Sequence, residues 1–282
     1  MIKMNTIDSK NRPLWTRSGA RLQLVRTSSH GKFHWLFLPG GPGLGSESLL
    51  PLLDILELPG NTWRLDLPGD GSNTMQDNKE AFSHWSQALI EAVSALDNVV
   101  LVGHSRGGMF ALSTPELQEK LAGLVLITSS PDMVWQNELE SKLINYQIPE
   151  ADEAGRKYEE NPSNELLRDC VVAAAPRMFF TQEALKNGIE VLSNLPYNYE
   201  SFQWTIEHFD PTYHAKWVPQ MPTLILSGEK DIAIPIHHFK GKKEYQLRNI
   251  IMKEIPGAGH FPWIENPQAV VAAFSAFVKM LS

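Results

Sequence analysis

Residues 99–112 of the chain read VVLVGHSRGGMFAL. The four apolar residues at the start predict a buried strand, and the apolar run at the end is compatible with a helix. Between them stands Ser105, with Gly103 and Gly107 two positions away on either side. A serine in such a strand-to-helix turn lifts its hydroxyl clear of the sheet, and strand and helix come so close that only small residues fit beside it. Because the pattern alone also arises by chance, its meaning depends on the rest of the chain.

Strands and helices alternate on both sides of this stretch. Further strands are predicted at residues 21–26, 33–38, 62–65, 124–128, 223–226 and 250–255, and helices at 47–56, 82–96, 236–247 and 267–281. A glycine-rich loop follows the strand at 33–38, in residues 39–45. Alternation of this kind predicts an α/β fold with a mostly parallel, doubly wound sheet and helices on both faces.

The alternation is interrupted from residue 131 to residue 217, a segment rich in helix formers and aromatic residues. We interpret residues 1–130 and 218–282 as one α/β core, and residues 131–217 as a helical cap inserted into it. Such an insertion lies over the edge where strands end and ligands bind. The alternative is an independent helical domain. We expect one or two cap aromatics to face a ligand and the rest to pack within the cap; the candidates are Trp135, Phe179, Phe180 and Trp204.

A serine hydroxyl is a weak nucleophile that needs a nearby base, and the base needs an acid to orient it. In this architecture the acid and then the histidine follow the serine along the chain. His260 lies in a glycine-rich loop directly after the strand at 250–255, and Asp231 follows the strand at 223–226. We therefore predict Ser105, His260 and Asp231 as nucleophile, base and acid, with Glu229 and Asp132 as the alternative acids.

Two other histidines, His237 and His238, also follow the candidate acid. They open a predicted helix, and we expect both to face solvent.

The tetrahedral oxyanion of such a reaction needs two backbone N–H donors. We predict that one is Arg106, which follows the nucleophile at a helix N-terminus, and that the other is Gly41 of the glycine-rich loop. The Arg106 side chain could hold an acidic substrate, but a solvated arginine or a salt bridge to the cap is the favoured interpretation.

Composition excludes several other classes of protein. The 282 residues carry a net charge of −7 without a basic cluster, which argues against nucleic-acid binding. Cys170 is the single cysteine and is expected to be a buried structural thiol. No Cys/His pair has zinc-site spacing, so we expect neither a metal nor a cofactor. No signal peptide is visible in the first ten residues and no apolar run could span a membrane, so a cytoplasmic protein is expected, either a monomer or a homodimer.

The chain resembles the α/β-hydrolase superfamily over nearly its whole length. The resemblance rests on PGGPG at 39–43, DLPGDGS at 66–72, GHSRGG at 103–108, GEKDIAIP at 228–235 and GHFP at 259–262 followed by ENP at 265–267. It implies a sheet of about eight strands, a helical cap and the same three catalytic residues. The chain departs from the superfamily at Pro39-Gly40, where a His-Gly pair is usual, which affects the packing of the loop. The loop also resembles that of proline iminopeptidases, but these have Gly-Gly-Ser-Trp-Gly at the serine.

These features predict hydrolysis of an ester, amide or related acyl bond of a small molecule through an acyl-serine intermediate. An aminopeptidase would need a carboxylate to hold the substrate ammonium group, and Glu207 is the candidate. Two alternatives use the same residues or the same fold: a carbon–carbon bond hydrolase and a non-enzymatic receptor for a small ligand. A dehalogenase is disfavoured because it needs a carboxylate at the position of Ser105.

Overall fold

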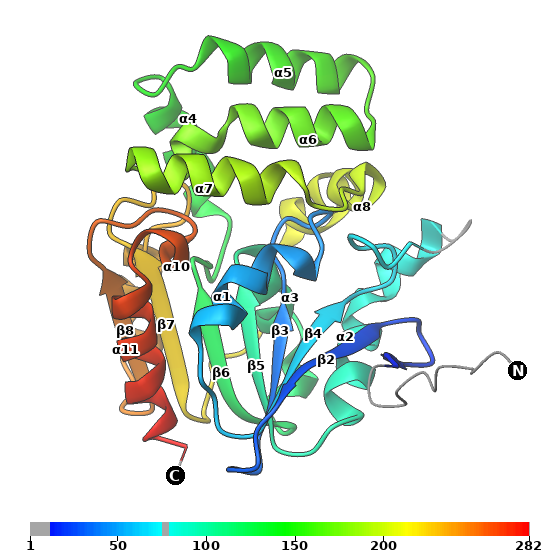
Figure 1. Ribbon diagram of the computed structural model, residues 1–282, viewed down its shortest axis with the longest axis vertical. Coiled ribbons are helices and arrows are strands. Elements are labelled where there is room, and N and C mark those ends of the chain that lie inside the picture. The colour runs from blue at the N-terminus through cyan, green and yellow to red at the C-terminus, as the bar shows by residue number, and fades with distance from the viewer. Residues whose placement is uncertain (1–11, 75–78, 282) are drawn as a thin grey trace, which may run out of the picture.

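The stretch at residues 99–112 forms strand β5 (Val99–His104) and helix α3 (Arg106–Leu112), with Ser105 between them. The computed structural model describes residues 12–74 and 79–281 (Figure 1). The N-terminal residues from which the absence of a signal peptide was expected lie outside this part. Every residue of β5 is buried, because the strand pairs with a parallel neighbour on each side. The motif therefore stands in the interior of the sheet.

The sheet has eight strands in the order β1-β2-β4-β3-β5-β6-β7-β8. β1 and β2 pair antiparallel, β2 and β4 pair antiparallel, and the remaining pairs are parallel. The other strands are β1 (Leu14–Trp15), β2 (Arg21–Thr27), β3 (His34–Leu38), β4 (Asn61–Asp66), β6 (Leu121–Ile127), β7 (Thr223–Gly228) and β8 (Ile250–Ile255). This confirms the predicted fold class, a mostly parallel sheet of about eight strands.

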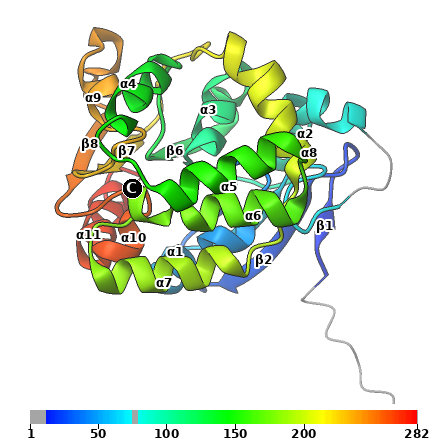
Figure 2. The same cartoon turned by 90° about the horizontal axis from the view of Figure 1, so that it is seen from above.

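Helices cover both faces of the sheet, and alternate residues of the central strands supply the two cores (Figures 1 and 2). In β5, Val100 and Val102 face the core that helices α1 (Leu50–Ile55) and α11 (Pro267–Val278) cover. Val99 and Leu101 face the core beneath α2 (Trp85–Ser94) and α3. Successive side chains of a strand point to opposite faces of the sheet. Because both faces are covered here, β5 is apolar at every position from 99 to 102.

Between β6 and β7 the chain forms helices and turns, and Asp132 and His214 pair in an isolated antiparallel β-bridge. The helices and turns are α4 (Val134–Leu143), α5 (Pro149–Glu160), α6 (Asn164–Ala173), the turn Ala175–Arg177, α7 (Gln182–Ser193), α8 (Tyr199–Trp204), the π-helical turn Thr205–Phe209 and the turn Asp210–Thr212. Helices α5, α6 and α7 stack above the sheet at the end where the parallel strands finish (Figure 1). Leu167, Phe179 and Leu192 of this segment belong to the same apolar cluster as Val100 of β5. The helical segment therefore shares its core with the sheet.

One predicted helix is much shorter than expected. Only His237–Lys240 form helix α9, and a separate turn follows at Lys243–Tyr245, in place of the continuous helix predicted at 236–247. Gly241 divides the two, and glycine is a poor residue for a helix interior. The chain then enters β8, and a short helix α10 (Pro262–Glu265) precedes α11. Across residues 12–74 and 79–281, no helix combines the length and apolar character needed to cross a membrane.

Candidate functional site

Ser105 occupies a strained turn, with φ 51° and ψ −126°. This φ lies in the left-handed region that non-glycine residues rarely adopt, and the serine N–H is held by the carbonyl of Ile127 at 2.8 Å. A Cβ atom on Gly103 would lie 2.6 Å from the backbone of α3, and one on Gly107 would collide with the carbonyl of Pro39. The close packing predicted around the serine is therefore present on both sides of it.

Ser105, His260 and Asp231 form a continuous chain of side-chain hydrogen bonds. Nε2 of His260 is 3.2 Å from Oγ of Ser105, and Nδ1 is 2.9 Å from Oδ2 of Asp231. The other carboxylate oxygen of Asp231 accepts hydrogen bonds from the N–H groups of Ala233 and Ile234, at 2.9 and 3.2 Å. Asp231 is 4% exposed, so its orientation is fixed by these contacts. The structure thus brings together the three side chains that the sequence singled out.

The backbone of His260 is anchored from three directions. Its carbonyl lies 3.2 Å from Nε2 of His104 and 3.3 Å from Oγ1 of Thr128, and its N–H donates to the carbonyl of Met178 at 3.1 Å. Burial, followed by the proximity of His260, holds the pKa of His104 well below its usual range. His104 is therefore neutral at pH 7, and its Nε2 proton donates to the carbonyl. These anchoring residues were missed by the sequence reasoning, although His104 and Met178 lie next to segments it had singled out.

Glu265 supports the same loop from α10. Its two carboxylate oxygens accept hydrogen bonds from the N–H groups of Gly259 and Phe180, so it links the His260 loop to the helical segment. The ring of Phe180 packs so closely against Gly259 that a Cβ atom there would lie 2.6 Å from it. Phe180 therefore contacts the loop of His260.

The alternative acids lie elsewhere. Glu229 accepts a hydrogen bond from the N–H of Gly257 at 2.8 Å, and Asp132 forms an ion pair with Lys242 at 2.8 Å. Neither carboxylate is a recorded partner of His260. Of the two histidines expected to face solvent, His237 is exposed, but His238 is buried. The expectation for His238 was wrong because α9 packs this side chain against α4.

Gly41 and Arg106 both line the cavity around Ser105. Gly41 has φ 109°, a value that favours glycine. Arg106 is the first residue of α3, where a backbone N–H has no acceptor within the helix. The Arg106 guanidinium forms an ion pair with Asp210 in the helical segment, so the predicted salt bridge is present and the charge is already paired.

The cavity that contains Ser105 has a volume of about 240 Å³. It is bordered by the glycine-rich loop on one side and by α6, the residues after it, and α8 on the other. The lining residues are Gly40, Gly41, Leu44, Ser48, His104, Ser105, Arg106, Cys170, Val171, Ala174, Met178, Phe202, His260 and Phe261. Aliphatic, aromatic and sulfur-containing side chains dominate this lining, so the cavity suits an apolar group.

None of the five tentative substrate-binding residues belongs to this lining. Trp135 packs beside Met109 and under the guanidinium of Arg106, and Phe179 stacks on Phe261. Trp204 packs against Phe82 and Trp85. Glu207 hydrogen-bonds Gln203 and lines a separate cavity of about 500 Å³. Phe180 contacts the His260 loop, so each of the five packs against other parts of the protein, and their contact with a substrate stays a prediction.

Cys170 was expected to be a buried structural thiol, but it is half-buried in α6 and lines the cavity of Ser105. Burial raises the pKa of this thiol, which leaves it protonated at neutral pH. Cys170 therefore contributes to the cavity as a small, weakly polar group.

Two buried carboxylates hold the glycine-rich loop in place. Oδ1 of Asp70 accepts a hydrogen bond from the N–H of Gly43 at 2.7 Å, and Asp66 accepts hydrogen bonds from both the N–H and the hydroxyl of Ser46. Burial, followed by the nearby charge of Asp66, raises the pKa of Asp70 to about 7. Asp66 also pairs with Arg21 at 2.8 Å. The position of the loop thus depends on carboxyl groups that water does not reach.

Comparison with known proteins agrees with this architecture. The model of the alpha/beta hydrolase family matches residues 35–273. The pimeloyl-acyl-carrier protein methyl ester esterase of Xylella fastidiosa (strain 9a5c) is 24% identical over 257 residues, which cover 87% of this chain and 95% of that protein. A solved alpha/beta fold family hydrolase from Bacillus anthracis str. Sterne has a TM-score of 0.74 and 15% identity, covering 96% of this chain and 99% of that one. A proline iminopeptidase-related protein from Thermus thermophilus has a TM-score of 0.67 and 17% identity, covering 96% of this chain and 98% of that one. The match to the family model spans most of the sequence, and the chain belongs to the alpha/beta hydrolase family.

Proposed function

We propose that the protein is a serine hydrolase that cleaves an ester, amide or related acyl bond of a small molecule through an acyl-serine intermediate. The observation that carries the proposal is the continuous chain of contacts from Oγ of Ser105 through His260 to Asp231, at 3.2 and 2.9 Å. A serine that contacts a histidine, which in turn contacts a buried aspartate, is the arrangement that activates a hydroxyl for attack on a carbonyl.

The proposed reaction begins with the neutral imidazole of His260. Because Asp231 accepts the proton on Nδ1, the unprotonated Nε2 faces the Ser105 hydroxyl. As Oγ attacks the substrate carbonyl carbon, Nε2 takes the hydroxyl proton, and the imidazolium is stabilised by Asp231. Nε2 then returns this proton to the leaving group as its bond to the carbonyl carbon breaks. Water repeats the sequence on the acyl-serine, releasing the acid and restoring the Ser105 hydroxyl.

The oxyanion of each tetrahedral intermediate is assigned to the backbone N–H groups of Arg106 and Gly41. Both residues border the cavity at Ser105. The Arg106 side chain donates to the carbonyl of Gly41 at 3.0 Å, which links the two donors' positions. Loss of one such donor typically lowers kcat by about 10²- to 10³-fold.

The proposed substrate carries a small apolar acyl or leaving group. The cavity volume of about 240 Å³ is below the roughly 300–1,000 Å³ usual for sites that bind drug-sized ligands. An aminopeptidase needs a carboxylate beside the reacting carbonyl. No aspartate or glutamate is among the described residues that line the cavity. These two observations favour a neutral ester over an aminoacyl amide.

We further propose that residues 131–217 act as a cap that selects the substrate. Cys170, Val171 and Ala174 of α6 and the turn that follows face Ser105 across the cavity, together with Met178 and Phe202. Substrate choice would then depend on the size of these side chains.

The proposal is tested by measuring kcat/KM on matched panels of p-nitrophenyl esters and aminoacyl arylamides. We expect turnover of short-chain esters, a much lower rate on arylamides, and no turnover by Ser105→Ala on either panel. Faster cleavage of arylamides would favour an aminopeptidase. Tight binding of small molecules without turnover of any ester or amide would favour a non-enzymatic receptor and contradict the proposal.

A further inference from the structure

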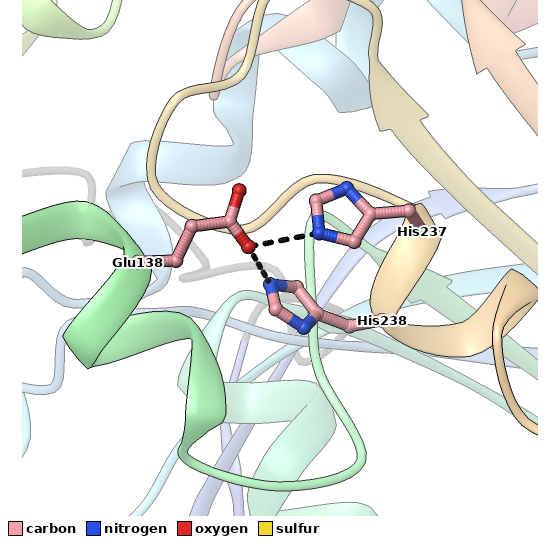
Figure 3. A group of neighbouring side chains, drawn as sticks. All are labelled: Glu138, His237 and His238. Carbon is pink, nitrogen blue, oxygen red and sulfur yellow. Dashed lines mark hydrogen bonds and ion pairs between the residues drawn. The ribbon is translucent and has the colours of Figure 1, made fainter. Parts of the chain in front are cut away.

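Glu138, His237 and His238 form a compact cluster away from the cavity of Ser105. Glu138 lies on α4, and the two histidines begin α9 (Figure 3). Nε2 of His237 is 2.8 Å and Nε2 of His238 is 3.3 Å from the same carboxylate oxygen, Oε2 of Glu138. The potential ligand atoms of all three residues lie within 4.8 Å of one another. The two rings therefore converge on one carboxylate from neighbouring positions of one short helix.

His238 supplies an independent sign that this cluster is adapted to a ligand. Its side chain is only 6% exposed, and its buried Nε2 atom has no hydrogen bond with any residue in the described part of the chain. That nitrogen points toward Oε2 of Glu138, as Figure 3 shows. Buried polar atoms are normally hydrogen-bonded, so an imidazole nitrogen that lies 3.3 Å from a carboxylate oxygen without a hydrogen bond calls for an explanation.

We propose that Glu138, His237 and His238 bind one divalent transition-metal ion of the zinc class. Two imidazole nitrogens and one carboxylate oxygen are a donor set that zinc uses in proteins, with a fourth position left for water. Imidazole ligands favour zinc, cobalt, nickel or copper over calcium and magnesium, which prefer oxygen-only sites. Small movements of the side chains would bring each donor to its roughly 2.0–2.2 Å coordination distance.

The charges around the cluster are compatible with a cation. The second carboxylate oxygen of Glu138 accepts a hydrogen bond from Lys142, which leaves Oε2 as the oxygen available to a metal. Carboxylates that ligate metals are commonly held by a hydrogen bond of this kind. The other nearby cation, Lys242, is paired with Asp132 at 2.8 Å. Both ammonium groups therefore already have carboxylate partners.

An occupied site would join two parts of the fold. α4 is the first helix of the segment between β6 and β7, and α9 follows the loop that carries Asp231. A metal bound to both would fasten the start of the helical segment to the sheet without touching Ser105. The site is therefore expected to change stability independently of the proposed hydrolase activity.

The test is isothermal titration of tag-free, EDTA-treated and desalted protein with ZnCl2. We expect one zinc ion per chain, and a tetrahedral cobalt spectrum when CoCl2 replaces zinc. His237→Gln and Glu138→Gln should each weaken zinc affinity by at least about tenfold. Both side chains are partly exposed, so these variants should fold. His30→Gln is the matched control, because His30 is an exposed histidine in the loop between β2 and β3, and it should leave affinity unchanged.

Thermal unfolding gives a second readout. At about a hundredfold excess of zinc over Kd, the wild-type Tm should rise by roughly 5 °C, and the Tm of His237→Gln should not. Absence of zinc binding by the wild type would overturn the proposal. Equal affinity in wild type, His237→Gln and Glu138→Gln would also overturn it, because the zinc would then be bound elsewhere on the surface.

Discussion

Arg106 and Asp210 form a two-point ion pair, with Nε and Nη2 of the guanidinium 3.0 and 2.6 Å from the two carboxylate oxygens. Arg106 directly follows Ser105, whereas Asp210 belongs to the helical segment. The same guanidinium donates to the carbonyl of Gly41, so one side chain connects the serine turn, the glycine-rich loop and the helical segment. Gln136 of α4 adds a hydrogen bond to Asp210 at 3.2 Å.

Removing one partner of this ion pair should cost both stability and activity. The two side chains are only 14% and 4% exposed, so Asp210→Asn should lower the free energy of unfolding by about 3 kcal/mol, because the guanidinium is left without a counter-ion. We also expect a fall in kcat with little change in KM, since the Gly41 donor loses its support. Urea unfolding and ester kinetics measure the two effects. In a double-mutant cycle with Arg106→Met, additive losses would contradict the coupling.

Asp231→Asn should lower kcat by about 10⁴-fold while leaving the fold intact, because the amide cannot hold His260 in the tautomer that accepts the serine proton. The matched control is Glu229→Gln, two positions away, whose carboxylate binds the N–H of Gly257. It should retain most of the activity. Near-normal turnover by Asp231→Asn would move the acid to another residue.

Asp70 should make the protein less stable as pH rises. Its pKa is raised from 3.8 to about 7 by burial, so the folded state holds this proton more tightly than the unfolded chain does. The contribution of Asp70 to stability therefore falls between about pH 4 and pH 7, by at most about 4 kcal/mol. Asp70→Asn keeps an oxygen for Gly43 and should remove this part of the pH dependence. Urea unfolding at several pH values tests it, and an unchanged slope in Asp70→Asn would refute it.

Cavity size should control the acyl-chain preference. Phe202 lines the cavity of Ser105, so Phe202→Ala should raise kcat/KM for longer acyl esters relative to acetate. Trp204, two residues along, packs on Phe82 and Trp85 instead. Trp204→Ala should lower stability by about 3 kcal/mol without shifting the chain-length preference. A series of p-nitrophenyl esters distinguishes the two variants, and equal shifts in preference would contradict the assignment of the lining.

The fold and the meeting of Ser105, His260 and Asp231 could be predicted because local sequence determines them. Ser105 directly follows β5, whereas Asp231 and His260 lie in the loops that follow β7 and β8, and these parallel strands end at the same edge of the sheet. The order of the strands across the sheet then brings the three side chains together. The glycines around Ser105 could also be predicted, because the backbone packs so closely on both sides of the serine that a larger residue does not fit.

The residues of the helical segment that line the cavity could not be predicted in this way. Aromatic content suggested Trp135, Phe179, Phe180 and Trp204, whereas α6, the following turn and α8 supply the cavity lining. Which face a helix turns toward a site depends on how the helices stack over the sheet, and composition does not determine that. Large aromatics are favoured in cores for their apolar area, and Trp135 and Phe179 are buried in this way.

The sequence did not identify which residues pair in other long-range polar contacts: it favoured a salt bridge from Arg106 to the helical segment but did not name Asp210. Arg106 and Asp210 are separated by 104 positions, and Glu138 and His237 by 99. The expectation of no metal site rested on ligand spacing within short motifs, and the site proposed between α4 and α9 would have no such spacing. His238 was expected to face solvent because α9 opens after a loop, yet its packing against α4 buries it.

The most direct test of the central claim is peptide mass spectrometry of the protein after incubation with a fluorophosphonate. We predict a single adduct on the peptide that contains Ser105, and none in Ser105→Ala. Folded wild-type protein that remains unlabelled, or that carries the adduct on another residue, would contradict the assignment of Ser105 as the nucleophile.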